Sequence, residues 1–423
     1  MVENLPVSRD RRVARQAAAL VAAGHDVSVI CPWDTGTGSQ NSDDLAEVEV
    51  LDFKIPAERP GVGGFFTEYS VAWVRMMQLL VKARRRGPID VVQVCNPPDI
   101  FFVHGWLAHR FGARFVFDQH DLAPELFETR FGTEGFLHRL LAWSEALTYR
   151  VADRVIATNE SYRQVAIERG GLQPEHVKVV RNGPDAQLMK RGEIDLALRG
   201  GRSHLVAWMG NMGPQDGVDD AVRAIDHLVH QIRRTDTSFV FIGKGEELDA
   251  VRRLATELKV DDYVTFTGWV TDEEAFAWLS AADVGLSADP PGPLNDLSTM
   301  NKTMEYMSFE LPVVAHDLTE TRFSAGDAGI YAKSGDPSGL AVAIDELLST
   351  PGHMVEMGQE GRHRIEAELA WRHQRQSYVD MYAELTGKHH KPTVNHHNDV
   401  PEDQASPNNG HVSDHGGRNV ATI

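Results

Sequence analysis

Cysteine is scarce in this sequence, and long apolar runs are lacking. Only Cys31 and Cys95 are cysteines among 423 residues, and both lie in apolar, strand-like runs. This placement is typical of small buried side chains in a reducing compartment rather than of a disulfide scaffold. No apolar run reaches the length of about 18 residues that a membrane-spanning helix needs. We therefore expect neither a spanning helix nor a secretory signal, and we expect the protein to act in the cytosol or on the cytosolic face of a membrane.

Basic residues are outnumbered. The chain has 42 lysines and arginines against 61 aspartates and glutamates, which gives a net charge of -19. Because nucleic-acid binding needs a basic face to neutralise phosphates, this balance argues against nucleic acid as a partner. The apolar content of 42% is a globular value, and the length leaves room for two domains with their own cores.

Short apolar runs alternate with helical segments along the chain. In the first half we expect strands at 25–31, 89–95, 114–118, 154–158 and 177–183. In the second half we expect strands at 204–210, 238–242, 264–270, 283–287 and 311–315. The expected helices include one from Ser8, its N-cap, to Ala23 and one over 69–82. This alternation predicts an α/β protein with parallel sheets, whose ligands bind beyond the carboxyl ends of the strands.

The segment 295–317 combines a polar loop, an amphipathic helix and a buried strand. Ser298 or Thr299 is a candidate N-cap for the helix. Lys302 and Glu305 are three residues apart, so they lie on one side of it. The free N–H groups and the dipole at the helix start, together with Lys302, predict a phosphate site. The alternative for Glu305 is a solvated carboxylate paired with Lys302.

Two glycine-containing loops in the second half each follow an apolar strand and open a helix. One loop contains Gly213 and Gln215, and the other contains Gly243 and Lys244. Such strand-loop-helix units can cradle a diphosphate. The first loop does not read G-x-G-x-x-G, so a dinucleotide site is not indicated.

Charged side chains stand at two prominent positions in the first half. His120 follows the strand 114–118, where ligands of α/β sheets bind; the alternative is a cap of the helix that starts at Leu122. Arg11 and Arg12 crowd the first turn of a helix, where the dipole disfavours cations. Local rules are broken most often at functional sites, so we hypothesise that these arginines meet an anionic acceptor group. The alternative is a solvated face balanced by Asp10.

Two further segments bear on partners. The segment 136–149 predicts a helix with an apolar stripe flanked by cations. We expect this stripe to face the core, with contact to a lipid surface as the alternative. From 388 to 423 the composition shifts to His, Asn, Pro, Asp and Gly, which predicts a disordered tail.

Three motifs together resemble the retaining glycosyltransferases of family 4, also called glycosyl transferase group 1, which have the GT-B fold. They are His120-Asp121 at a strand end, the V-x-N-G turn at 180–183, and K-x-x-E-Y-M at 302–307 followed by E-L-P-V-V at 310–314. The resemblance spans about 2–385. It implies two Rossmann-like, doubly wound parallel-sheet domains facing an interlobe cleft. The implied parts are an acceptor domain at 1–185, a linker at 186–203, a nucleotide-sugar domain at 204–370, and a crossover helix at 371–387.

The resemblance also implies roles for individual residues. Glu305 would bind the ribose hydroxyls of a nucleotide sugar, and the loop before the helix, with Ser298 and Thr299, would hold the sugar and diphosphate. The family has a second glutamate eight positions earlier, where this chain has Leu297, so Asn295 or Asp296 would reach the donor sugar instead.

On the acceptor side, His120 would position donor and acceptor, with Asp121 and Glu125 nearby. The departing diphosphate would itself take the acceptor proton. Its charge would be stabilised by helix N-termini with Lys302 and Lys244, without a metal ion or cofactor.

The implied function is retaining transfer of a hexosyl group from a nucleoside-diphosphate sugar to a lipid-linked or polysaccharide acceptor, in surface polysaccharide or glycolipid synthesis. Two alternatives stay open. One is a GT-B sugar-nucleotide epimerase or phosphorylase. The other is a non-catalytic sugar-nucleotide-binding partner protein, because Leu297 and Gln215 stand where the family has a glutamate and a lysine.

Overall fold

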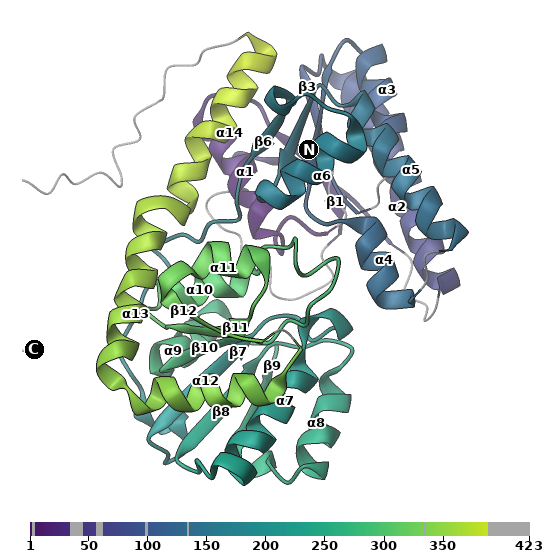
Figure 1. The fold of residues 1–423 in the computed structure, drawn as a ribbon. Helices are drawn as coiled ribbons and strands as arrows, with labels where there is room; N and C mark the ends of the chain where they lie inside the picture. The colour runs from purple at the N-terminus through teal and green to yellow at the C-terminus, as the bar shows by residue number, and fades with distance from the viewer. Residues whose placement is uncertain are drawn as a thin grey trace, which may run out of the picture.

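The computed structural model describes residues 1, 5–33, 45–55, 62–97, 100–132, 135–333 and 335–387. The tail predicted at 388–423 lies outside these residues. Figure 1 shows two α/β lobes, with α13 (Pro351–Arg364) and α14 (Trp371–Thr386) along one side. Every strand pairing in the sheets is parallel, as the sequence predicts.

The N-lobe carries two parallel sheets, β1-β2 and β3-β4-β5-β6. Its strands are β1 (Ser28–Pro32), β2 (Glu49–Phe53), β3 (Val91–Cys95), β4 (Arg114–Gln119), β5 (Arg154–Ala157) and β6 (Val177–Val179). Its helices are α1 (Arg11–Ala22), α2 (Val62–Arg86), α3 (Phe102–Arg110), α4 (Ala123–Phe131), α5 (Phe136–Val151) and α6 (Glu160–Gly170). The helix α14 returns to this lobe, where Tyr378, Met381 and Tyr382 join a core cluster with Val13 and Val29.

The C-lobe is built on one sheet with the strand order β12-β11-β10-β7-β8-β9. Its strands are β7 (His204–Met209), β8 (Thr237–Ile242), β9 (Val264–Gly268), β10 (Val284–Ser287), β11 (Val313–His316) and β12 (Gly329–Ala332). Its helices are α7 (Val218–Asp226), α8 (Leu248–Glu257), α9 (Asp272–Ala281), α10 (Asn301–Ser308), α11 (Thr319–Ala325) and α12 (Pro337–Ser349). Because β10, β7 and β8 are neighbours, the loops that follow them meet at one edge of the sheet.

Three helix starts differ from the sequence predictions. Asp10, not Ser8, caps α1, because its carboxylate accepts from the backbone N–H groups of Arg12 and Val13. The helix expected over 69–82 is longer and runs as α2. Neither Ser298 nor Thr299 caps α10, whose N-cap is Met300 with no side-chain hydrogen bond.

The apolar stripe of α5 does not face the core, so that expectation was wrong. Phe136, Leu140 and Trp143 are exposed, whereas the buried face carries Ser144, Glu145, Thr148 and Tyr149. The polar face of α5 can be buried because its side chains have polar partners. The Thr148 hydroxyl accepts from the Phe102 N–H at 3.1 Å, and Glu145 pairs with Arg169 at 2.5 Å.

The segment 186–203, predicted as a linker, is packed on the C-lobe, since Ala186 and Met189 belong to that lobe's core. Within the described ranges, none of the helices is both long enough and apolar enough to cross a bilayer.

Candidate active site

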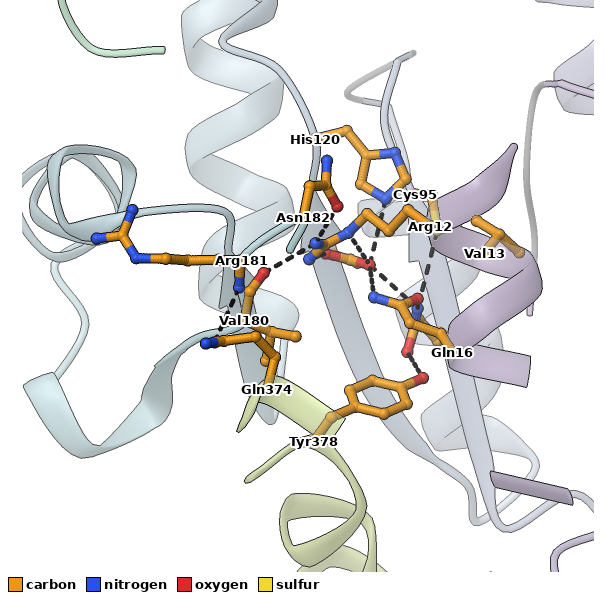
Figure 2. A network of polar contacts seen from close by, with 12 residues as sticks. Arg12, Val13, Gln16, Cys95, His120, Val180, Arg181, Asn182, Gln374 and Tyr378 are labelled. Atoms are coloured by element: carbon orange, nitrogen blue, oxygen red, sulfur yellow. Dashed lines mark hydrogen bonds and ion pairs between the residues drawn. The ribbon is translucent and has the colours of Figure 1, made fainter. Parts of the chain in front are cut away.

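A buried carboxylate organises the N-lobe side of the site, where Figure 2 shows Arg12, Gln16 and His120 gathered in one network of polar contacts. This carboxylate belongs to Asp118, which lies at the end of β4 and whose side chain is fully buried. Arg12 reaches it from α1 with two hydrogen bonds, Nη2 to Oδ1 at 2.7 Å and Nε to Oδ2 at 3.1 Å. The second terminal nitrogen of Arg12 donates to the Val180 carbonyl at 2.8 Å and to Asn182 Oδ1 at 2.7 Å. Asp118 therefore has a buried cation held in place by the β6 end of the same lobe.

Arg12 does not present its charge to the cleft. Its side chain is only 5% exposed, and all three guanidinium nitrogens donate to protein acceptors. The hypothesis that Arg12 meets an anionic acceptor is therefore corrected: its partner is Asp118, which is 106 residues away in the sequence.

His120 completes the group around Asp118. Its Nε2 lies 3.2 Å from Asp118 Oδ2, and its Nδ1 lies 4.0 Å from Asp10 Oδ2. Burial opposes the charged imidazole, but Asp118 outweighs burial and raises the pKa of His120 to about 9. Burial would likewise raise the pKa of Asp118, yet Arg12 and His120 hold that pKa well below its usual range. Near neutral pH His120 is therefore a cation that can bind an anion or an oxygen lone pair, rather than a free base.

The alternative of a helix cap does not hold for His120. The N-cap of α4 is Leu122, without a side-chain hydrogen bond. Asn96, which sequence reasoning missed, fixes the turn instead. Its Oδ1 accepts from the His120 N–H at 2.6 Å, and its Nδ2 donates to the Asp121 carbonyl at 2.7 Å. The only sequence signal was its place at the end of an apolar strand.

Potential ligand atoms of Cys95, Asp118 and His120 lie within 4.8 Å of one another. These residues do not suit a metal ion, because the Arg12 guanidinium already occupies both oxygens of Asp118 and would repel a second cation.

Glu125 is also committed to the protein. It forms an ion pair with Arg169, whose other terminal nitrogen contacts Glu145 at 2.5 Å. Burial raises the pKa of Glu145 to about 7, with Arg169 opposing that rise. The predicted substrate contact by Glu125 is corrected, since this carboxylate pairs with Arg169. Arg169 in turn holds Glu145 on the buried polar face of α5.

On the C-lobe side, Lys302 lies at the start of α10 with its side chain 9% exposed. Its Nζ donates to Asp289 Oδ1 at 2.8 Å, lies 3.9 Å from Asp216 Oδ1, and sits 4.7 Å from the Trp208 ring centroid. A methyl group added to Gly210 would lie 3.8 Å from the same nitrogen. Lys302 is therefore held against the loop that follows β7.

The two glycine loops pack backbone against backbone beside Lys302. A Cβ on Gly243 would lie 1.9 Å from the Gly210 carbonyl oxygen, and its φ of 134° is one that glycine favours. The Gly213 N–H donates to Asp216 Oδ2 at 3.0 Å, and the Gln215 carbonyl accepts from Asn295 Nδ2 at 2.8 Å. Lys244 is exposed, and its side chain has no polar partner in the described part of the chain.

Glu305 is not paired with Lys302, which removes that alternative. Arg11 of the N-lobe reaches across to Glu305 Oε1 at 3.3 Å and also pairs with Asp272 at the start of α9. Burial raises the pKa of Glu305, and Arg11 opposes that rise. The Glu305 side chain is 20% exposed, and Arg11 is 48% exposed. This contact joins the two lobes at the predicted donor site.

The loop before α10 inserts into the N-lobe. Leu294 belongs to an N-lobe core cluster, and Leu297 packs against it. Asn159 Nδ2 donates to the Leu297 carbonyl at 2.8 Å and to Thr299 Oγ1 at 3.0 Å, while the Ser298 and Tyr162 hydroxyls are 2.8 Å apart. The predicted donor contacts of Ser298 and Thr299 are thus replaced here by contacts between the lobes.

The two residues proposed to substitute for the missing glutamate differ in availability. Both amide hydrogens of Asn295 are used, because Nδ2 donates to the carbonyls of Gln215 and Pro290 at 2.8 Å each. Asp296 is partly exposed, and burial raises its pKa. Asp296 is therefore the freer of the two.

Two lobes, each built on parallel sheet with flanking helices, have the architecture of the GT-B fold. A profile described as "Glycosyl transferase 4-like domain" matches residues 10–183, and one described as "Glycosyl transferases group 1" matches residues 203–350. The chain belongs to glycosyltransferase family 4 and is a glycosyltransferase.

Individual relatives agree with this family. Glycogen synthase of Mycobacterium tuberculosis is 25% identical over 375 residues, covering 85% of this chain and 87% of that protein. A GDP-mannose-dependent alpha-(1-6)-phosphatidylinositol monomannoside mannosyltransferase of Mycolicibacterium smegmatis is 28% identical over 194 residues, covering 45% and 49%. The structure of Anabaena HepE in complex with UDP-glucose superposes with a TM-score of 0.69 at 16% identity, covering 90% of this chain and 98% of HepE. At 16% identity the superposition shows a shared fold and nothing more.

Proposed function

We propose that this enzyme transfers a hexosyl group, with retention, from a nucleoside-diphosphate sugar on the C-lobe to an acceptor on the N-lobe. The observation that carries the proposal is the Arg11–Glu305 contact of 3.3 Å, which brings the donor-side carboxylate against the helix that also supplies the partner of Asp118. Donor and acceptor sites are therefore within reach of one another when the lobes close.

The chemistry follows from the charges in place. The bond between the donor's anomeric carbon and the diphosphate oxygen breaks, and the acceptor oxygen bonds to that carbon on the same face. The acceptor proton passes to the departing diphosphate. Lys302 and the N–H groups at the start of α10 stabilise the negative charge that develops there, so we propose that no divalent ion is required. The Lys302 ammonium group has three hydrogens to donate. Asp289 accepts one of them, so two remain for phosphate oxygens.

Glu305 binds donor hydroxyls as an acceptor once Arg11 withdraws. His120, charged and held by Asp118, orients the reacting sugar and acceptor. The donor named for one relative, GDP-mannose, supports a nucleoside-diphosphate hexose as the donor class.

We further propose a lipid-linked acceptor, reached at the cytosolic face of a membrane. The aromatic face formed by Phe102, Trp106, Phe136, Leu140 and Trp143 supports this. Phe136 is 77%, Trp143 57% and Trp106 55% exposed, and the Phe102 ring contacts both tryptophans. Exposed apolar groups gathered in this way mark an interaction surface, and tryptophan suits the headgroup region of a bilayer.

Charge around the aromatic face points to anionic lipid as its occupant. Arg139 and Arg150 lie four residues before and seven after Trp143, and Arg110 follows Trp106 by four, so each shares a helix side with a tryptophan. All three arginines are exposed and have no ion pair within the described ranges. In a chain of net charge -19, this local positive charge complements a negative bilayer.

Vesicle sedimentation tests the membrane proposal. We expect binding to vesicles that contain phosphatidylglycerol, weaker binding to pure phosphatidylcholine, and loss of binding in a Phe136→Ser/Trp143→Ser variant. Trp269→Ser, which removes an equally exposed tryptophan from the C-lobe, is the control and should bind normally. Binding that is unchanged in the double variant would contradict the proposal.

Turnover tests the transfer reaction. The protein is first screened by thermal shift against nucleoside-diphosphate sugars, because a selective ligand stabilises the fold. The selected donor is then incubated with and without lipid-linked acceptors. Glycosylated product formed together with nucleoside diphosphate supports the proposal. An interconverted sugar released from donor alone would favour an epimerase or phosphorylase, and binding without turnover on any acceptor would favour a non-catalytic sugar-nucleotide binder.

A further inference from the structure

The crossover helix α14 sends two hydroxyl groups into the polar centre of the N-lobe. Tyr378 donates to Gln93 Oε1 at 2.9 Å, and Tyr382 donates to the same oxygen at 2.6 Å. Figure 2 shows Tyr378 below the group formed by Arg12, Gln16 and His120. Tyr378, Tyr382 and Gln93 are all buried, so no solvent competes for these hydrogen bonds.

The two tyrosine hydroxyls at one end and the Asp118 carboxylate at the other together set the direction of the hydrogen bonds between them. Because the carbonyl oxygen of Gln93 accepts from both hydroxyls, its Nε2 must point the other way. That nitrogen donates to Gln16 Oε1 at 2.8 Å and lies 3.3 Å from Asp118 Oδ2. With its own carbonyl used, Gln16 turns its Nε2 to Asp118 Oδ2 at 2.7 Å. The chain of amides therefore carries only donors to the carboxylate.

We propose that Tyr378 and Tyr382 are positioning residues for His120: they orient the amide chain through Gln93 and Gln16, and this chain fixes the carboxylate that holds the imidazole. When both hydroxyls are removed, the Gln93 amide oxygen loses its two donors, and the amide can rotate so that its Nε2 leaves Gln16 Oε1 and Asp118. The tyrosines touch no substrate and act through three intermediate residues. The proposal rests on the proposed function only where it concerns turnover.

Other charged groups around His120 leave this assignment intact. Asp118 of β4 faces Nε2, Asp10 before α1 faces Nδ1, Arg12 lies beside Asp118, and Cys95 of β3 is within 4.8 Å. None of these contacts involves α14. The hydroxyls of Tyr378 and Tyr382 therefore reach His120 through Gln93, whereas Gln374 of α14 accepts from the Arg181 N–H.

The test is a set of phenylalanine variants with the His120 pKa measured by nitrogen-15 NMR. In Tyr378→Phe or Tyr382→Phe one hydroxyl still orients Gln93, so we expect a pKa close to that of the natural chain. In the double variant Asp118 loses hydrogen bonds from the Gln16 and Gln93 amides. These bonds partly neutralise the carboxylate, so without them its attraction for the charged imidazole is stronger. We expect the pKa of His120 to rise by roughly one unit, far more than the sum of the single changes.

Turnover provides a second readout. We expect kcat of the double variant to fall about tenfold with the donor KM unchanged, because the donor binds the other lobe. Tyr331→Phe is the matched control. Its hydroxyl donates to the Gly326 carbonyl at 2.8 Å in the C-lobe, and its loss should leave both readouts unchanged.

The outcomes separate the two proposals. An unchanged or lowered His120 pKa in the double variant, or single changes that add up to the double change, would overturn the positioning role. A raised pKa in a protein without transferase activity would leave the positioning role standing and overturn the proposed function. If the double variant does not fold, Gln93→Met removes the same link from the other side and should produce the same rise.

Discussion

The two sides of the cleft hold their charged groups in different ways. On the N-lobe, Arg12 and Asp118 are 5% and 0% exposed and find their partners within one lobe. On the C-lobe, Glu305 finds its cation in Arg11, which belongs to the opposite lobe and is 48% exposed. The proposed acceptor side is therefore assembled within one lobe, whereas the proposed donor side is completed by contact between the lobes.

This difference assigns different tasks to the two sides. A buried, fully paired group costs stability when it is broken but needs no reorganisation during turnover. A contact across the cleft can be exchanged for a ligand. The contacts of Asn159 and Tyr162 with the loop before α10 also join the lobes, so they too can be exchanged for a ligand. Donor binding must then compete with contacts that the free protein makes with itself.

The largest effect should come from breaking the N-lobe pair. Asp118→Asn leaves the buried Arg12 guanidinium uncompensated, so we expect the free energy of unfolding to fall by about 3–5 kcal/mol in chemical denaturation. Asp317→Asn, which breaks an exposed pair with Arg322, is the control and should cost about 1 kcal/mol or less. A loss in Asp118→Asn no greater than in the control would show that the N-lobe pair is not a buried structural unit.

The next effect is a pH dependence of stability due to His120. Its pKa is raised to about 9 in the folded protein, above a value of about 6.5 in an unfolded chain. The stabilisation is therefore fully present below about pH 6.5 and is lost as pH rises through 9, by about 3 kcal/mol at most. We expect denaturation curves of the natural chain to show this decline and those of His120→Gln to lack it. Equal slopes in both proteins would contradict the assigned charge.

On the donor side, Glu305→Gln should affect function more than folding. The amide keeps the shape of the side chain but removes the negative acceptor, so we expect kcat/KM for the donor to fall about 100-fold. Stability should stay within about 1 kcal/mol, because burial already disfavours the charged form. If Glu305→Gln has the same kcat/KM for the donor as the natural chain, Glu305 does not contact the donor.

The smallest effect should follow from Arg11→Ala. Removing this half-exposed partner frees Glu305, and exposed ion pairs are worth about 0.2–1 kcal/mol, so donor affinity should rise about two- to fivefold in calorimetry. Weaker donor binding would instead make Arg11 part of the donor site. Combining Arg11→Ala with Glu305→Gln should abolish the gain.

Most strands could be predicted because they are short apolar runs with a glycine or polar break, whereas β2, which reads E-V-L-D-F, was not predicted. His120, Lys302 and Glu305 could be proposed as site residues because strand ends and helix starts are recognisable locally. The face of α5 was mispredicted because periodicity identifies a stripe but not its partner. Glu145 is buried there only because Arg169, from another helix, pairs with it.

The polar centre of the N-lobe was missed for the same reason. Arg12 was recognised as a charge in an unfavourable place, but its partner is 106 residues away. Gln93 lies in a strand that reads V-V-Q-V-C, where one polar residue is the only local signal. Tyr378 contacts it across 285 residues, a distance over which sequence patterns carry no information about pairing.

Product analysis by proton NMR tests the central claim most directly. The protein is incubated with the selected α-linked nucleoside-diphosphate hexose and a lipid-linked acceptor, and the anomeric proton of the product is followed as nucleoside diphosphate appears. We expect an α-linked product, with one nucleoside diphosphate released per bond formed. A β-linked product, or nucleotide release without a new glycosidic bond, would contradict retaining transfer between the two lobes.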